Sequence, residues 1–272
     1  MNFKETLFRC SSLGHIMVNP RSGTGLSEGC KTHLIDVYVA NKYNRRNEIS
    51  TRYMEKGNLV EEDSITLISR HKKVFLKKNE EHLSNKWIKG TPDIYEGESI
   101  RNADKITDAK SSWDIYTFSR TIAKEELNNI YYWQVQGYMD LTKAESAAVT
   151  YCLNNTPAHL IDSEKRKLQW QMGVIDPTTD PLFAEGCKEI EKNFIYDIDT
   201  FIKTNRGYDL HYSIEEWKDL GLDIPMHERI FEYNVDRNDS DIMKMHKRVE
   251  DCREWLNEYD KTRNEVANKI AA

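Results

Sequence analysis

The chain has 272 residues, of which 45 are acidic and 39 basic, giving a formal net charge of −6. A chain of this length, 39% hydrophobic and 31% charged, suits one large or two small domains with a buried core under a charged surface. Its 10% of aromatic residues disfavours disorder, and neither a membrane helix of ~18 apolar residues nor the apolar stretch of a signal peptide is present, so we expect a cytoplasmic protein with no membrane contact.

The N-terminal third is expected to be helical. Ser11 or Ser12 can cap a short helix that runs to Met17, where Pro and Gly residues follow. A second helix is expected over about 27–42. Apolar residues within 58–70 recur at helical spacing, which predicts a third helix there.

The period then changes to that of strands. Short runs bounded by Asn, Gly and Ser predict a strand meander over 73–78, 86–95 and 104–112. Two helices are expected next, over about 114–127 and 129–142, and the apolar run at 144–153 predicts a return to strand.

The C-terminal part is expected to be mostly helical. It is interrupted by a loop rich in Pro and Asp at 176–181 and by one strand at 229–237. A long helix is expected over about 240–270, capped by Asp239 or Ser240. Its apolar residues step by three and four, which is typical of a helix packed along its length. It can pack on its own domain or on another subunit.

Two features of the composition bear on ligands. The five cysteines form no CxxC pair or Cys/His cluster, which disfavours zinc and iron–sulfur sites and predicts buried free thiols. The segment 70–89, in contrast, is basic within an acidic chain. It carries Lys72, Lys73, Lys77 and Lys78, and we expect it to lie along a nucleic acid, although a solvated face is the alternative.

The informative acidic residues flank two predicted strands. Asp93 follows Gly-Thr-Pro, and Asp108-Ala109-Lys110 lies inside the next strand. Side chains two residues apart in a strand point to the same face, so Asp108 and Lys110 face together, and pairing of the strands brings Asp93 to them. Two carboxylates suit Mg²⁺ or Mn²⁺, and a lysine beside them can stabilise developing negative charge.

Two helices supply further polar groups. Glu61, or its neighbour Glu62, can reach such a metal from the helix side. Gln134 and Tyr138 are four residues apart and share one helix face. An amide and a phenol beside the carboxylates can position DNA backbone or a metal-bound water, although a buried tyrosine with a satisfied glutamine is the alternative.

The order of these motifs resembles the PD-(D/E)xK nuclease superfamily, and within it the phage recombination exonucleases of the lambda-exonuclease or YqaJ-like branch. The similarity covers about residues 8–153. The matching motifs are the helix Gly57-Asn-Leu-Val-Glu61, then Thr91-Pro92-Asp93, then Asp108-Ala109-Lys110, then Gln134-Val135-Gln136, and the opening Ser11 with Pro20-Arg21-Ser22-Gly23.

The resemblance implies an α/β (α+β) fold: a restriction-endonuclease-like nuclease core with a central mixed β-sheet flanked by helices and a helical C-terminal extension. Residues 1–155 are expected to form the core with N-terminal DNA-end-binding helices, and residues 156–272 to pack on it. The expected ligands of Mg²⁺ or Mn²⁺ are Asp93, Asp108, the Ala109 carbonyl and Glu61.

The implied activity is hydrolysis of double-stranded DNA by an exonuclease that runs 5′→3′ and leaves 3′ overhangs for a single-strand annealing recombination protein, in a trimeric ring. Lys110 and Gln134 are expected to be catalytic. The residues expected to contact DNA are Arg9, Ser11, Ser12, Lys72, Lys73, Thr91, Gln136 and Tyr138, with Lys4 as an alternative to Arg9. A structure- or sequence-specific endonuclease and a catalytically silent DNA-binding relative are the alternatives.

Overall fold

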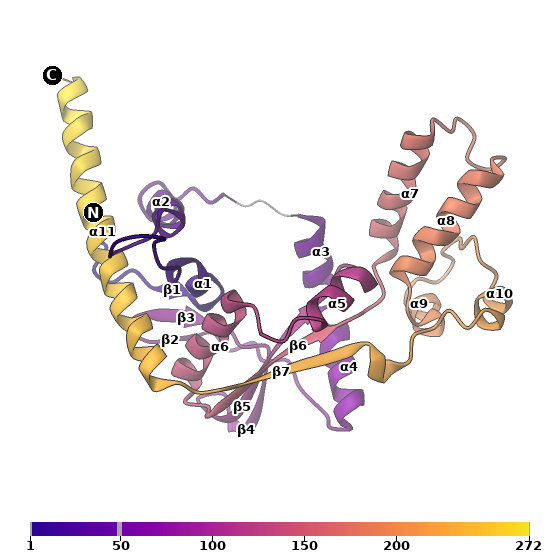
Figure 1. The fold of residues 1–272 in the computed structure, drawn as a ribbon, viewed down its shortest axis with the longest axis horizontal. Coiled ribbons are helices and arrows are strands. Elements are labelled where there is room, and N and C mark those ends of the chain that lie inside the picture. The colour runs from indigo at the N-terminus through magenta and orange to yellow at the C-terminus, as the bar shows by residue number, and fades with distance from the viewer. Residues whose placement is uncertain (1, 48–50, 272) are drawn as a thin grey trace.

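A computed structural model describes residues 2–47 and 51–271 and has a mixed α/β architecture (Figure 1). A small sheet has the order β1 (Phe8–Arg9), β3 (Ile88–Gly90), β2 (Leu83–Ser84). A larger sheet has the order β4 (Ile94–Ser99), β5 (Asn102–Ser111), β6 (Ser146–Cys152), β7 (Ile230–Asp236).

Helices flank both sheets. Those of the N-terminal half are α1 (Leu13–Ile16), α2 (Glu28–Tyr43), α3 (Arg52–Leu59), α4 (Glu61–Lys72), α5 (Ile115–Ile122) and α6 (Asn129–Thr142). Those of the C-terminal half are α7 (Ala158–Met172), α8 (Pro181–Phe194), α9 (Ile198–Thr204), α10 (Ile214–Asp219) and α11 (Asp239–Ala271). Two short 3-10 turns, η1 (Cys10–Ser12) and η2 (Met226–Glu228), complete the assignment.

Strand β5 lies inside the larger sheet, between β4 and β6. It pairs antiparallel with β4 and parallel with β6, and the parallel pairing requires the crossover that α5 and α6 provide. Ile106 of β5 packs in the core with α6, whereas Ala109 packs with α4 on the other face. Because side chains alternate along a strand, Asp108 and Lys110 share the α6 face with Ile106.

The C-terminal part divides between two places. Helices α7 to α10 surround a second apolar cluster, which contains Phe201 and Trp217 and also Trp113 from the segment between β5 and α5 (Figure 1). Strand β7 then joins the larger sheet beside β6, and α11 packs on α1, α2 and α6. The chain after residue 156 therefore contributes an edge strand and a long helix to the core as well as a separate helical lobe.

Three predicted elements need correction. Residues 73–78 are not a strand: Lys73 ends α4 in a left-handed conformation, Val74 and Phe75 are exposed, and only Lys78 makes a bridge, to Ile94. The helix expected over 114–127 already ends at Ile122. The long C-terminal helix begins at Asp239, so neither predicted cap is right.

The cap of α11 is Asn238, whose side chain accepts a hydrogen bond from the Asp241 N–H. The apolar seam of this helix is confirmed, because Met245, Val249 and Leu256 are fully buried against the rest of the chain. The prediction of free thiols is also confirmed, since all five cysteines are unpaired and buried. Among the residues that the structure describes, no helix is long and apolar enough to cross a membrane.

Candidate active site

Asp93, Asp108 and Lys110 meet where β4 begins and β5 ends. The Oδ2 atom of Asp93 accepts a hydrogen bond of 2.8 Å from the Ala109 N–H. The Lys110 ammonium lies 2.7 Å from Oδ2 of Asp108, and Asp108 itself is 1% exposed. The convergence that strand periodicity predicted is therefore present in the structure.

The charges in this cluster perturb one another. Burial, followed by the charge of Asp108, raises the pKa of Asp93 to about 7. Burial also raises the pKa of Asp108, although Lys110 opposes the shift. Burial alone would lower the pKa of Lys110, but the two carboxylates outweigh it and raise that pKa. Two acids with raised pKa values beside a cation are typical of a functional site, since both carboxylates are hard to ionise together.

Two side chains of helix α6 hold Asp108 in position. The Gln134 side-chain amide donates to Asp108 Oδ1 at 3.0 Å and to the Tyr138 hydroxyl at 3.1 Å. Both side chains are buried, so they position the carboxylate and do not form an exposed surface. Burial, followed by the charge of Asp108, raises the pKa of the Tyr138 phenol, which therefore stays protonated.

The residues present fit a divalent cation in part. Asp108 Oδ2 is buried, and its partner among the described residues is the Lys110 ammonium, 2.7 Å away. Two carboxylates side by side are a suitable hard-ligand set. However, the described part of the chain contains no group of three His, Cys, Asp or Glu side chains arranged to hold a metal ion.

The position of Glu61 shows why the site lacks a third ligand side chain. It begins α4, close enough that its charge raises the pKa of both Asp93 and Asp108, yet its carboxylate is 3.1 Å from the Lys78 ammonium. The structure thus brings Glu61 to the edge of the site but pairs it with a lysine. Direct ligation by Glu61 requires that pair to open, and the ligand role of the Ala109 carbonyl stays a prediction.

Two predicted DNA contacts are not supported. Gln136 is fully buried, donates to the Asp236 carbonyl at 2.8 Å and accepts from the Asn238 N–H at 3.0 Å. It therefore joins α6 to β7 and to the start of α11, and the prediction that it contacts DNA is wrong. Tyr138 is 5% exposed, so it supports Gln134 and is not available to DNA.

The predicted 5′-end residues gather around the small sheet. Arg9 lies opposite Lys89 where β1 pairs with β3, and Thr91 follows β3 directly. Arg9 and Ser11 are exposed. Ser12 does not cap α1; its hydroxyl donates to the Arg9 carbonyl at 2.8 Å, because the 3-10 turn η1 runs straight into the helix.

The basic segment has two kinds of lysine. Lys72 is 2.8 Å from Glu232 of β7, and Lys78 is paired with Glu61. Lys73 and Lys77 are exposed and have no ion pair among the described residues. The structure therefore leaves Lys73 and Lys77 available to a phosphate backbone and gives Lys72 an acidic partner.

Close packing around α6 was not anticipated from the sequence. A Cβ at Gly14 would lie 2.5 Å from the Ile130 Cα, and one at Gly137 would lie 2.5 Å from the Leu13 side chain. A Cβ at Gly90 would lie 2.7 Å from the Tyr138 ring. These glycines let η1, α1 and β3 approach the helix that holds Gln134. A glycine inside an otherwise regular helix or strand was the feature of the sequence that could have indicated this close packing.

Comparisons with known proteins identify similar solved structures. No family model and no curated protein sequence matches the chain. The crystal structure of a phage-related exonuclease from Haemophilus somnus 129PT has a TM-score of 0.64 at 23% identity, with 95% of this chain and 96% of that chain covered.

The alkaline exonuclease LHK-Exo from Laribacter hongkongensis has a TM-score of 0.57 at 11% identity, with 98% and 96% covered. Its complex with dAMP has the same TM-score at 12% identity and the same coverage. The chain therefore has the fold of these exonucleases along almost its whole length, which confirms the expected fold class and the resemblance to that branch at the level of fold.

Proposed function

We propose that the protein is a metal-dependent deoxyribonuclease, an exonuclease that hydrolyses phosphodiester bonds of double-stranded DNA from its ends. The observation that carries this proposal is the cluster of Asp93, Asp108 and Lys110, in which two carboxyl groups with raised pKa values lie beside one ammonium. A fold shared with two exonucleases supports the assignment but does not make it, because one fold hosts many activities.

Each residue has a task in this scheme. Asp93 and Asp108 would hold Mg²⁺ or Mn²⁺, which when bound neutralises charge on the scissile phosphate and activates a water. Lys110 lies beside Asp108 and stabilises the charge that develops in the transition state. Gln134 keeps the Asp108 carboxylate in one orientation through its 3.0 Å hydrogen bond. Glu61 takes part directly or through a water once Lys78 is displaced.

The test of exonuclease against endonuclease uses DNA topology. With Mg²⁺, a linear duplex should be degraded from its ends while a closed circular duplex stays intact. Nicking of the circle would identify an endonuclease. Equal binding with no cleavage of either substrate would identify a catalytically silent DNA-binding protein.

We further propose 5′→3′ polarity with a terminal-phosphate site at Arg9, Ser11, Ser12 and Thr91. The exposed Ser11 and Arg9, with the half-buried Ser12 and Thr91, can hold a terminal phosphate and set the scissile bond over the carboxylates. The wild type should degrade a 5′-phosphorylated duplex faster than a 5′-hydroxyl duplex. This preference should vanish in the double variant Ser11→Ala, Arg9→Ala, and equal rates in the wild type would reject the site.

DNA contact along residues 70–89 is proposed for Lys73 and Lys77. Each phosphate neutralised contributes about −0.9 to the slope of log K against log salt on duplex DNA. Replacing both lysines by Ala should flatten that slope by nearly two. The control variant Lys72→Ala, whose lysine already has Glu232 as partner, should leave it nearly unchanged.

Assembly and partners follow from the same proposal. A 3′ overhang left by 5′→3′ digestion is a substrate for a single-strand annealing protein, and we propose such a protein as the functional partner. A trimeric ring would keep the enzyme on one DNA end. Light scattering at several protein concentrations measures the oligomeric state, and end-labelled DNA followed under single-turnover conditions measures processivity.

A further inference from the structure

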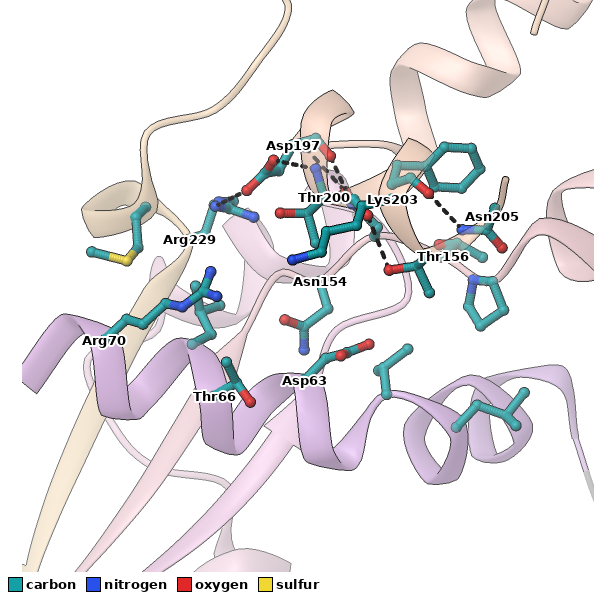
Figure 2. A pocket seen from close by; sticks show the side chains of 18 of the residues that line it. Asp63, Thr66, Arg70, Asn154, Thr156, Asp197, Thr200, Lys203, Asn205 and Arg229 are labelled. Atoms are coloured by element: carbon teal, nitrogen blue, oxygen red, sulfur yellow. Dashed lines mark hydrogen bonds and ion pairs between the residues drawn. The ribbon is translucent and has the colours of Figure 1, made fainter. Parts of the chain in front are cut away.

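A cavity lies between α4 and the helical lobe formed by α7 to α10, away from the carboxylate cluster. It has a volume of about 710 Å³ and is lined by α4, by the loop after β6, by α9 and by Arg229. Figure 2 shows Thr66 and Arg70 on α4 across the space from Thr200 and Lys203 on α9. Its volume lies in the range of roughly 300–1,000 Å³ that is typical of small-molecule sites.

Two buried polar atoms in its lining have no hydrogen-bond partner among the described residues. They are Oγ1 of Thr156, a residue 1% exposed, and Nε of Arg229, a residue 8% exposed. Leaving such groups without a partner costs roughly 1–3 kcal/mol each, so native proteins satisfy nearly all of them. Both atoms are almost inaccessible behind the cavity wall, so the groups that a ligand can reach are the exposed cations of the lining.

The charges of the lining favour an anion. Arg70 and Lys203 are exposed at the cavity and form no ion pair within the described chain, whereas Arg229 donates through Nη2 to Asp197 at 3.1 Å. Asp197 is already engaged, because it also accepts from the Thr200 N–H at the start of α9. The lining therefore holds three Lys or Arg side chains against two acids, Asp197 and Asp63.

We propose that this cavity binds a phosphate group through Arg70 and Lys203, with the guanidinium of Arg229 as a third positive charge in the wall. Two guanidinium groups and an ammonium around one space match the several oxygens of a phosphate better than the two of a carboxylate. The phosphate can belong to a free nucleotide or to the backbone of a DNA strand. This site goes beyond the proposed nuclease function, since its lining includes none of Asp93, Asp108 and Lys110.

A series of hydrogen bonds joins the cavity wall to β5. Asn154 lines the cavity and donates to the Ser64 hydroxyl at 2.6 Å. Ser64 in turn lies 2.8 Å from the hydroxyl of Ser111, the residue after Lys110 in β5. These hydrogen bonds join the wall of the cavity to the strand that carries Lys110.

The test measures binding to the full-length protein in EDTA at low salt, by calorimetry. The probes are inorganic phosphate, dAMP and deoxyadenosine, which lacks the phosphate. Phosphate and dAMP should bind and deoxyadenosine should not. The double variant Arg70→Ala, Lys203→Ala should weaken dAMP binding about tenfold or more, because hydrogen bonds to charged groups are lost.

Two controls separate this site from the nuclease proposal. Arg206→Ala removes an exposed cation that does not line the cavity and should leave dAMP binding unchanged. Asp108→Asn should also leave it unchanged, whether or not that variant hydrolyses DNA. Undiminished dAMP binding in the Arg70/Lys203 double variant, or binding that disappears in Asp108→Asn, would overturn the proposal.

A competition experiment then identifies the source of the phosphate. A single-stranded oligothymidylate is added to the complex with dAMP. Displacement of dAMP that depends on Arg70 and Lys203 would assign the site to a DNA backbone. Retention of dAMP against the oligonucleotide would assign it to a free nucleotide. Absence of binding by phosphate, dAMP and oligonucleotide alike would reject a phosphate site of either kind.

Discussion

Two buried lysine–carboxylate pairs in this molecule have the same contact distance and different surroundings. Lys110 lies 2.7 Å from Asp108 at the sheet edge, and Lys165 lies 2.7 Å from Glu191 in the helical lobe. Glu191 also accepts hydrogen bonds from the His211 and Tyr212 N–H groups, so both of its oxygens are satisfied. The Oδ2 atom of Asp108 has only Lys110 as a partner among the described residues, and Asp93 is a second acid close by.

We propose that the difference separates a structural pair from a reactive one. A buried ion pair is tolerated when hydrogen bonds satisfy the remaining lone pairs, which is the state of Glu191. Each oxygen of Asp108 has one partner among the described residues, Gln134 or Lys110, and burial raises the pKa of this carboxyl, an arrangement that a bound cation would relieve. Variants of each pair should therefore affect different properties: activity at the first and stability at the second.

The largest effect is expected from Asp108→Asn. The amide keeps the hydrogen bond from Gln134 but removes a carboxylate ligand, and metal-assisted charge stabilisation contributes several kcal/mol. Turnover of linear duplex at saturating Mg²⁺ should fall by on the order of 10³-fold, while DNA binding is partly retained because phosphate contacts lie elsewhere. Near-normal turnover in this variant would remove Asp108 from the metal site.

Glu191→Gln should act on stability alone. Neutralising one partner of a buried pair leaves Lys165 as an uncompensated charge, and the free energy of unfolding should fall by about 3 kcal/mol. Urea denaturation measures the loss, and turnover per folded molecule should match the wild type. The matched control is Glu189→Gln, an exposed pair with Lys192, which should change stability by less than about 1 kcal/mol. A similar loss in both variants would contradict the distinction.

Lys110→Ala should lower kcat by about 10²-fold, the effect of removing one preorganised electrostatic group. Because the interaction is made in the transition state, KM should change little. Steady-state kinetics on a 5′-phosphorylated duplex separate the two parameters. A rise in KM at unchanged kcat would make Lys110 a phosphate anchor.

The smallest effect concerns pH and stability. The pKa of Asp93 is raised from its ordinary 3.8 to about 7, so the folded state keeps a proton that the unfolded state has lost. Stability in EDTA should therefore decline as pH rises from about 4 to about 7. Asp93→Asn should remove part of this decline and add about 1–2 kcal/mol at pH 8, with little change at pH 4.

Thermal unfolding across this pH range, with and without Mg²⁺, measures the effect of Asp93→Asn. Asp104→Asn, at an exposed position on the neighbouring strand β5, is the control and should not change the slope. A slope that is the same in the Asp93 variant and the wild type would show that Asp93 titrates normally.

The sequence alone determined the residues that meet at the candidate active site. Asp108 and Lys110 share a face because strand side chains alternate, and Gln134 and Tyr138 share one because a helix repeats every 3.6 residues. Both periods are local properties of the backbone. The pairing of β4 with β5, which brings Asp93 to Ala109, needed only that two adjacent strands form a hairpin.

Only the tertiary structure decided the partners that come from distant segments. Glu61 is paired with Lys78, Lys72 with Glu232, and Gln136 with the backbone around Asp236. The cavity between α4 and α9 likewise joins residues far apart in the chain. The periodicity of an element predicts on which face each side chain lies. The group that a side chain contacts on another element depends on how the elements pack, and the local sequence does not determine that packing.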